Sequence, residues 1–214
     1  RRLAIIANGG GPGVLAADWV NEIALELGKL SAASVSALQP LLPPHASLTD
    51  LIDLSESAGP EHYKAAIEAA DKDRQIDGVL AIFSPRPGTD AQGIAQALAD
   101  AKPRMGKPLL TCWMGDASVM AARGVLKMAT IPSFRTPEAA VGAFGNIASF
   151  YQNQQLLQQT PPPLSTLAKP DIEGARLVIE SALAERRKVL TEMESKTLLA
   201  AFHIPVTKTI LARS

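Results

Sequence analysis

Short apolar runs alternate with segments of helical periodicity along the first 160 residues of the chain. Such alternation predicts strands joined by right-handed helical crossovers, which makes the strands parallel and covers both faces of the sheet with helices. The five predicted strands are residues 3–7, 27–30, 79–83, 109–113 and 131–134. We therefore expect an α/β fold with a doubly wound, parallel, five-stranded sheet.

Two of these runs, 79–83 and 109–113, contain no in/out alternation of apolar and polar residues, which is typical of strands covered on both faces. They are predicted to be the central strands. Each intervening helix is predicted to turn one apolar stripe toward the sheet. The stripes are Leu15, Trp19 and Ile23; Tyr63 and Ile67; Ile94 and Leu98; Val119, Ala122 and Leu126; and Ala140, Val141, Phe144, Ile147 and Tyr151.

Charge and cysteine content exclude several classes of partner and site. Lys and Arg number 21, as do Asp and Glu, so no net field favours nucleic acid or an acidic membrane. The single cysteine, Cys112, excludes an internal disulfide and a cysteine-based zinc site, and indicates a reducing compartment. No apolar stretch approaches the roughly 20 residues that span a bilayer, and the amino terminus does not resemble a signal peptide. We expect a soluble cytoplasmic protein without a membrane partner.

The composition changes at Thr160, where three consecutive prolines follow and cannot continue a helix. Beyond them the sequence predicts a charged helix over 171–189 and a capping box at Thr191-x-x-Glu194. The last apolar run, 206–211, predicts a strand that has no partner, and we therefore expect a piece of a longer protein. The predicted domains are 1–158, a linker over 159–190, and the start of a further domain at 191–214.

The first predicted strand runs into a glycine-rich loop and then into a helix. This order aims unpaired backbone N–H groups and the positive end of a helix dipole at one point above the sheet. We therefore predict that an anion such as phosphate binds at this loop. The predicted phosphate-binding residues are Asn8, Gly9, Gly10, Gly11, Pro12 and Gly13.

The alternative explanation for the loop is a tight turn that needs positive φ angles. Neither phosphate-binding consensus fits, because the loop has no P-loop lysine and position 14, where Gly-x-Gly-x-x-Gly requires its last glycine, is Val. Nucleotide binding through this loop is therefore not expected.

Three further loops are expected at the carboxyl edge of the sheet, where ligands of parallel sheets collect. They are residues 53–57, 84–90 and 114–118, and their candidate accessory residues are Asp53, Ser55, Ser84 and Asp116. Helix capping alone would explain these residues, and contact with a substrate or partner is the second interpretation. The three histidines, at positions 45, 62 and 203, have no nucleophile or metal partner nearby in sequence, so we predict structural or solvated roles and neither a catalytic residue nor a metal site.

Several segments resemble the NDP-forming acyl-CoA synthetases, the relatives of succinyl-CoA synthetase. The resemblance covers residues 1 to about 151 and is strongest over 6–18, 42–47, 73–83 and 107–115. It identifies a flavodoxin-like ligase-CoA domain. The tail, 194–206, resembles the opening of the ATP-grasp domain of that family.

The resemblance implies a set of partners and cofactors for the longer protein. These are upstream CoA-binding and ligase domains and a downstream ATP-grasp domain in the same chain, with acetyl-CoA or CoA and ATP or ADP as ligands. In that family a phosphorylated histidine, here expected upstream of residue 1, is held between two helix amino termini. When the family's contacts are carried over to this sequence, one of the two helix amino termini falls on residues 8–13. The fragment alone is not expected to be an enzyme.

One departure from the family leaves the activity open. The synthetases usually have Asn-Pro-Ile/Val-Asp where this chain has Asp50-Leu51-Ile52-Asp53. With the glutamine-rich segment 151–160 and the proline tract, the chain looks more similar to the Pat-type protein lysine acetyltransferases of enterobacteria, in which a synthetase-like region is fused to a GNAT acetyltransferase domain. That resemblance implies a regulatory or structural role and a lysine-bearing protein substrate. The alternatives are part of an active acyl-CoA synthetase and a free-standing anion-binding module.

Overall fold

A computed structural model describes residues 1–159 and 169–207. The chain divides into two compact units, Arg1–Leu157 and Gln158–Ser214, and each is described by itself. The predicted proline tract at 160–163 lies outside the described residues. The identification of 191–214 as the start of an ATP-grasp domain stays a prediction.

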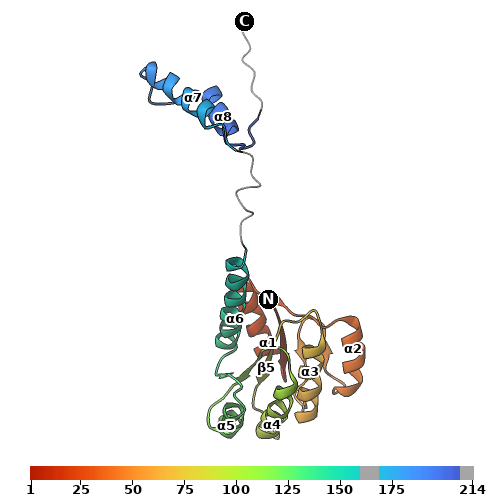
Figure 1. Ribbon diagram of the computed structural model, residues 1–214. Coiled ribbons are helices and arrows are strands. Elements are labelled where there is room, and N and C mark those ends of the chain that lie inside the picture. The colour runs from red at the N-terminus through yellow and green to blue at the C-terminus, as the bar shows by residue number, and fades with distance from the viewer. Residues whose placement is uncertain (160–168, 208–214) are drawn as a thin grey trace. The chain divides into compact units, whose positions relative to one another are not determined.

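A single mixed sheet forms the centre of the first unit (Figure 1). Its seven strands, all within residues 1–159, are β1 (Arg2–Ala7), β2 (Glu26–Leu27), β3 (Ser47–Leu48), β4 (Ile52–Asp53), β5 (Gly78–Phe83), β6 (Leu109–Trp113) and β7 (Ser133–Phe134). Their order is β3-β4-β1-β5-β6-β7, and β2 pairs with the amino end of β1. As predicted, β5 and β6 have a parallel neighbour on each side.

The prediction of five parallel strands was wrong in number and in uniformity. Where one strand was expected at 27–30, β2 and β4 pair with opposite ends of β1, and β3 joins β4 in antiparallel orientation. Strands of two residues produce no apolar run, which is why β3 and β4 left no signal. The sheet is nonetheless dominated by parallel pairs, as the alternation with helices indicated.

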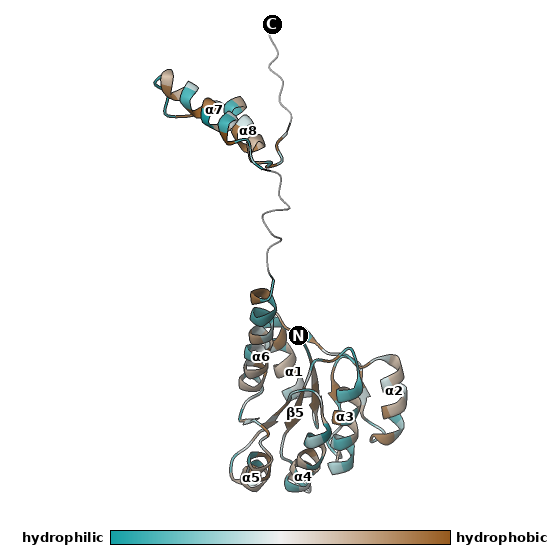
Figure 2. Ribbon diagram, viewed as in Figure 1, coloured by the Kyte–Doolittle hydropathy of each residue, from teal (hydrophilic) through white to brown (hydrophobic). Residues whose placement is uncertain are grey.

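Helices cover both faces of this sheet. They are α1 (Gly10–Glu22), α2 (Ala32–Leu38), α3 (Pro60–Lys72), α4 (Ala91–Ala101), α5 (Met120–Met128) and α6 (Pro137–Leu157). Alternate residues of β1 separate the two halves of the core: Leu3 and Ile5 belong to a cluster with α1 and α6, whereas Ala4 and Ile6 belong to a cluster with α2 to α5. The long strand β5 between the layers is accordingly coloured as hydrophobic (Figure 2).

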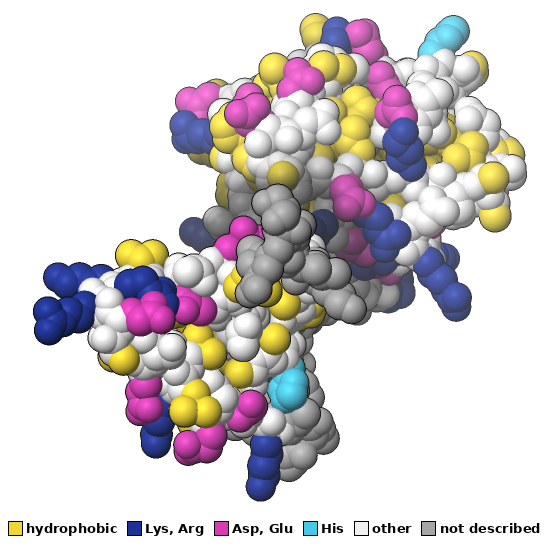
Figure 3. Space-filling model, turned by 90° about the horizontal axis from the view of Figure 1, so that it is seen from above, with side chains coloured by type: hydrophobic (Ala, Val, Ile, Leu, Met, Phe, Trp, Pro, Cys, Tyr) yellow, Lys and Arg dark blue, Asp and Glu magenta, His cyan; other side chains and the backbone are white. Residues whose placement is uncertain are grey.

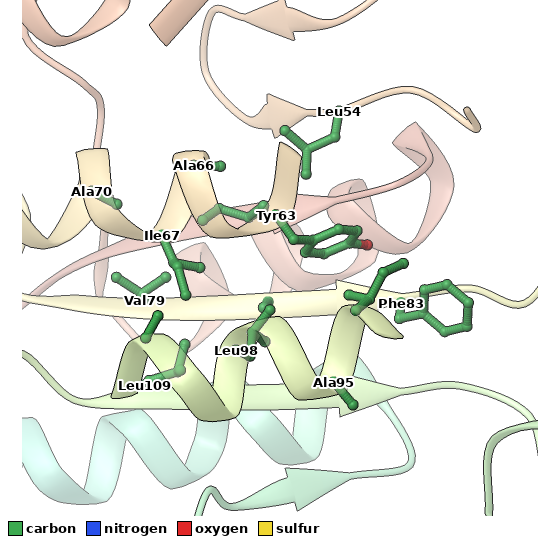
Figure 4. Close-up of a cluster of buried hydrophobic side chains, with 14 of the residues drawn as sticks. Leu54, Tyr63, Ala66, Ile67, Ala70, Val79, Phe83, Ala95, Leu98 and Leu109 are labelled. Atoms are coloured by element: carbon green, nitrogen blue, oxygen red, sulfur yellow. The ribbon is translucent and has the colours of Figure 1, made fainter. Parts of the chain in front are cut away.

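Aromatic rings fill the core on the side of α3 and α4 (Figure 4). Phe83 stacks on Trp113 with ring centroids 5.5 Å apart, and Tyr63 contacts the same indole at 6.4 Å. The Tyr63 hydroxyl is fully buried and donates a hydrogen bond to the Ile82 carbonyl oxygen at 2.6 Å. Burial raises the pKa of Tyr63 well above its usual value, so this phenol stays protonated and structural.

The predicted stripes of α3, α4 and α5 are buried, but that of α1 is not. Leu15 and Trp19 are 48% and 38% exposed, and the buried face of α1 consists of Gly13, Ala16 and Val20. Small residues face the sheet because α1 also packs against α6. Tyr151, at the end of the predicted α6 stripe, is likewise exposed.

The second unit contains two helices, α7 (Ile172–Ala184) and α8 (Glu192–Ala201). The predicted capping box is confirmed, since Thr191 Oγ1 accepts from Glu194 N at 3.3 Å and Glu194 Oε2 accepts from Thr191 N at 2.7 Å. Arg187 holds the same carboxylate with two hydrogen bonds of 2.6 and 2.8 Å. The charged helix ends at Ala184 rather than at 189. The strand predicted at 206–211 lies mostly outside the described residues.

Basic and acidic side chains are interspersed on the face shown in Figure 3, in keeping with the zero net charge. Among residues 1–159 and 169–207, no helix combines the length and apolar character that crossing a membrane requires.

Candidate functional site

The loops singled out in the sequence meet at one edge of the sheet because the strands before them end in register. Ala7, the last residue of β1, pairs with Asp53 at the end of β4 and with Ile82 near the end of β5. Phe83 in turn pairs with Trp113 at the end of β6. The amino end of α1 therefore lies at the carboxyl edge, beside the loops that follow β4 and β5.

Asn8 joins two of these loops and is fully buried. Its Nδ2 donates to the Ser84 carbonyl oxygen at 2.9 Å, and its Oδ1 accepts from Ser84 N at 2.8 Å. Both ends of the amide are thus occupied by the backbone after β5. The structure brings these two predicted site residues together, and it gives Asn8 a role in positioning the glycine loop.

The backbone of the glycine loop differs from a tight turn. Gly9 is the N-cap of α1 with an extended φ of 174°, and Gly10 to Gly13 form the first turn. Among the described glycines only Gly88 and Gly115 have a φ in the left-handed region, at 82° and 96°, so the tight-turn explanation is wrong for this loop. No side chain caps this helix start, and its first turn contains no acidic residue. The first N–H groups of α1 therefore have no side-chain cap.

An open hollow of about 450 Å³ adjoins this helix start. Its lining combines backbone, hydroxyl, acidic and basic groups from four segments, namely the start of α1 and the loops before β3, after β4 and after β5. The lining residues are Gly9, Gly10, His45, Asp53, Ser55, Glu56, Ser57 and Arg86. Two predicted glycines and two predicted accessory residues are among them. Arg86, Glu56 and His45 were not singled out as site residues, although charged side chains in loops that follow parallel strands are a usable signal.

Opposite charges flank the two glycines of the hollow. A Cβ built on Gly10 would lie 3.5 Å from Asp53 Oδ2, and one built on Gly9 would lie 3.7 Å from Arg86 Nη2. Arg86 Nη2 is also 2.9 Å from Glu56 Oε1. The helix dipole and one guanidinium thus favour an anion here, whereas the Asp53 carboxylate opposes it and the Glu56 carboxylate pairs with the guanidinium.

The other predicted accessory residues have local roles. Asp53 Oδ1 accepts from Ser55 N at 2.9 Å, which stabilises a turn in which Ser55 has a φ of 69°. Asp116 does not line the hollow, and its exposed carboxylate lies 3.8 Å from Arg135 Nη2.

The remaining histidines serve helix ends. His62 Nδ1 accepts from Gly59 N at 2.9 Å at the start of α3, and His203 Nε2 lies 3.1 Å from the Lys169 carbonyl oxygen. Within the part of the chain that the structure describes, no three His, Cys, Asp or Glu side chains are grouped as metal ligands would be.

Two curated relatives align with this chain. It is 27% identical over 212 residues to acetate–CoA ligase [ADP-forming] I of Archaeoglobus fulgidus, an alignment that covers 99% of the chain and 30% of the relative. It is 31% identical over 148 residues to acetate–CoA ligase [ADP-forming] II subunit alpha of Pyrococcus furiosus, covering 66% of the chain and 32% of the relative. Its homologues are ADP-forming acetyl-CoA synthetases. The chain spans about 30% of the length of these relatives, and no family model matches it.

A solved structure of an acetyl-coenzyme A synthetase has the same fold as part of this chain. The dinucleotide-forming acetyl-coenzyme A synthetase 1 of Candidatus Korarchaeum cryptofilum, in complex with phosphate and ADP, superposes with a TM-score of 0.68 at 25% identity. The superposition covers 75% of this chain and 36% of the synthetase. The α/β unit therefore corresponds to one domain of a multi-domain synthetase.

Proposed function

We propose that this chain is the flavodoxin-like ligase-CoA domain of an ADP-forming acyl-CoA synthetase, in which the start of α1 holds a phosphoryl group. Homology to such ligases over 99% of the chain carries the proposal. The strand order supports it: with β2 and β4 sharing the second position, the sheet follows the order 2-1-3-4-5 typical of flavodoxin-like folds.

The residues of the site divide into those that would bind the anion and those that position it. The N–H groups of Gly9, Gly10 and Gly11 and the dipole of α1 would stabilise the phosphoryl oxygens. Asn8 would fix the loop through its two hydrogen bonds to Ser84. The family resemblance supplies a phosphohistidine from upstream as the anion, while CoA and ADP would bind to other domains of the longer protein.

Turnover by the longer protein that contains this chain tests the function. Incubation with acetyl-CoA, ADP and phosphate should yield acetate, CoA and ATP in equal amounts, because the acyl thioester supplies the free energy for phosphorylating ADP. Consumption of acetyl-CoA without ATP formation would contradict a synthetase.

A second candidate is a regulatory domain of a GNAT-fused protein lysine acetyltransferase. Leu51, which stands where the synthetases usually have Pro, favours it: the Leu51 side chain packs into the core near α1, and a Cβ on Gly13 would lie only 3.2 Å from Leu51 Cδ1. Leu51 thus contacts α1 at a position where the resemblance led us to expect Pro. For this candidate, acetyl-CoA and a lysine-bearing protein should give acetyl-lysine and CoA, with no ATP formed from ADP and phosphate.

Binding by the 214-residue chain itself is tested by titration with inorganic phosphate. A single exposed helix terminus contributes on the order of 0.3–1 kcal/mol per charge–dipole interaction, so we expect a dissociation constant in the millimolar range that rises with salt. The amide resonances of Gly9 to Gly11 should shift in a ¹⁵N-resolved NMR titration. Unchanged amides at saturating phosphate would contradict the site.

A further inference from the structure

Both positive features of the hollow beside α1 already face a carboxylate of the same chain. Asp53 lies next to Gly10 in the first turn of α1, and Arg86 lies next to Gly9. Arg86 Nη2 and Glu56 Oε1 are 2.9 Å apart, and the two residues come from the loops after β5 and β4. An anion that enters the hollow must therefore compete with Glu56 for Arg86, and it would lie near the Asp53 carboxylate.

We propose that Glu56 and Arg86 form an exchangeable ion pair that controls how a phosphoryl group binds at the start of α1. This inference rests on the proposed function, because it concerns the same site. When the anion enters, Arg86 leaves Glu56, and its planar guanidinium donates to two phosphoryl oxygens beside Gly9. When the anion leaves, Glu56 takes the guanidinium back.

The structure fixes the backbone of Arg86 and leaves its side chain free to exchange. Arg86 N donates to Thr89 Oγ1 at 3.1 Å, and the Arg86 carbonyl oxygen accepts from Thr89 Oγ1 at 2.7 Å and from Thr89 N at 3.1 Å. The Arg86 and Glu56 side chains are 45% and 63% exposed, so water screens their attraction and the pair is weak. A swing of the guanidinium toward α1 therefore requires no rearrangement of the loop.

The charges also indicate how firmly the ligand is held. Asp53, Glu56 and Arg86 together carry a formal charge of −1 − 1 + 1 = −1. A site that holds an anion permanently would be expected to carry a net positive charge. The negative balance opposes tight binding of a phosphoryl group, and Glu56 contributes to this by holding Arg86.

A set of charge-removing variants of the 214-residue chain tests this exchange in NMR titrations with inorganic phosphate at constant ionic strength. Glu56→Gln frees Arg86 and should tighten phosphate binding roughly two- to five-fold, the size expected for an exposed ion pair. Arg86→Gln should weaken binding about five-fold or more. In the double variant the Glu56 effect should disappear, because Glu56 acts through Arg86.

The matched control is another exposed ion pair of the same unit, Glu68 with Arg104, at 3.6 Å. Glu68→Gln and Arg104→Gln make the same charge changes away from the hollow and should leave phosphate affinity unchanged.

Each outcome decides the proposal. Tighter binding by Glu56→Gln that vanishes without Arg86 supports the exchange. If the parent binds phosphate and Glu56→Gln does not tighten it, or tightens it equally in the Arg86→Gln background, the exchange is overturned while the proposed function stands. If neither the parent nor any variant shows shifts at Gly9 to Gly11, the phosphate site and the exchange both fail.

Discussion

Gly78, the first residue of β5, lies where an added methyl group should be costly. A Cβ at this position would stand 2.3 Å from Phe144 Cε2 and 3.0 Å from Phe144 Cδ2 and Cζ. Carbon atoms pack favourably at about 3.5–4.0 Å, so the ring would have to move by roughly 1.2 Å or more. Phe144 is 3% exposed and lies within the cluster that joins α6 to the sheet, which leaves little room for that movement.

Gly78→Ala should therefore lower the free energy of unfolding by about 1–3 kcal/mol, the usual cost of overpacking a core. The opposing gain from replacing a strand glycine is about 0.5–1 kcal/mol, so destabilisation prevails. Urea denaturation followed by tryptophan fluorescence measures this change in the free energy of unfolding. Both tryptophans, Trp19 and Trp113, belong to the unit that contains Gly78. Gly142→Ala on α6 is the matched control: a Cβ there meets nothing within 4 Å, and the variant should be slightly more stable.

A double-mutant cycle with Phe144→Leu tests the stated cause. The smaller side chain makes room for the Cβ at position 78, so the two substitutions should together cost about 1 kcal/mol less than the sum of their separate effects. Additive effects, or a loss below about 0.5 kcal/mol for Gly78→Ala alone, would refute the packing argument.

Three further substitutions test local interactions. Burial alone would raise the pKa of Asp73, but hydrogen bonds from Ser34 and from backbone amides lower it far below the usual value. The ionised Asp73 therefore stabilises the fold above the unfolded-state pKa of about 3.9, and this contribution is lost as the pH falls. Asp73→Asn should flatten the acid limb of a curve of unfolding free energy against pH. Lys107→Met removes the ammonium that caps the last carbonyls of α3 and should cost about 1–2 kcal/mol in urea denaturation. Thr191→Ala breaks the capping box with Glu194 and should increase hydrogen exchange in α8 but not in β5.

The long strands and most helices were predictable because the hydrophobic pattern of their own residues indicates them. Residues 79–83 form an uninterrupted apolar run, and 109–113 contain one polar residue, Thr111, among apolar ones. Such runs are typical of strands that are buried on both faces of a sheet. The stripe of α1 was not predictable in the same way. Periodicity favoured the large Leu15 and Trp19, whereas the close approach of α1 to the sheet and to α6 selected Gly13 and Ala16.

The location of the candidate site could be predicted from the sequence, but the charged side chains that line it could not. Strand–glycine–helix order alone located the start of α1 at the sheet edge, and the loops after β4 and β5 were expected beside it. The positions of Arg86 and Glu56 depend on a pairing between loops 30 residues apart, which no local pattern encodes. The same holds for the side chain of Asn8, which was predicted only as part of the anion-binding loop, whereas its amide is paired with the Ser84 backbone.

Gly11 is the residue of the loop for which the fold supplies no reason. Its φ is not positive, and a Cβ there would meet nothing within 4 Å, so Gly11→Ala should leave stability unchanged or raise it by up to about 1 kcal/mol through helix propensity. A bound phosphate, however, would approach this backbone from outside, where the new methyl group would stand. We therefore expect Gly11→Ala to weaken the phosphate-induced shifts of the Gly9 to Gly11 amides, while Gly142→Ala leaves them as in the parent. A full phosphate response in a stable Gly11→Ala protein would mean that the anion does not approach α1 at this residue.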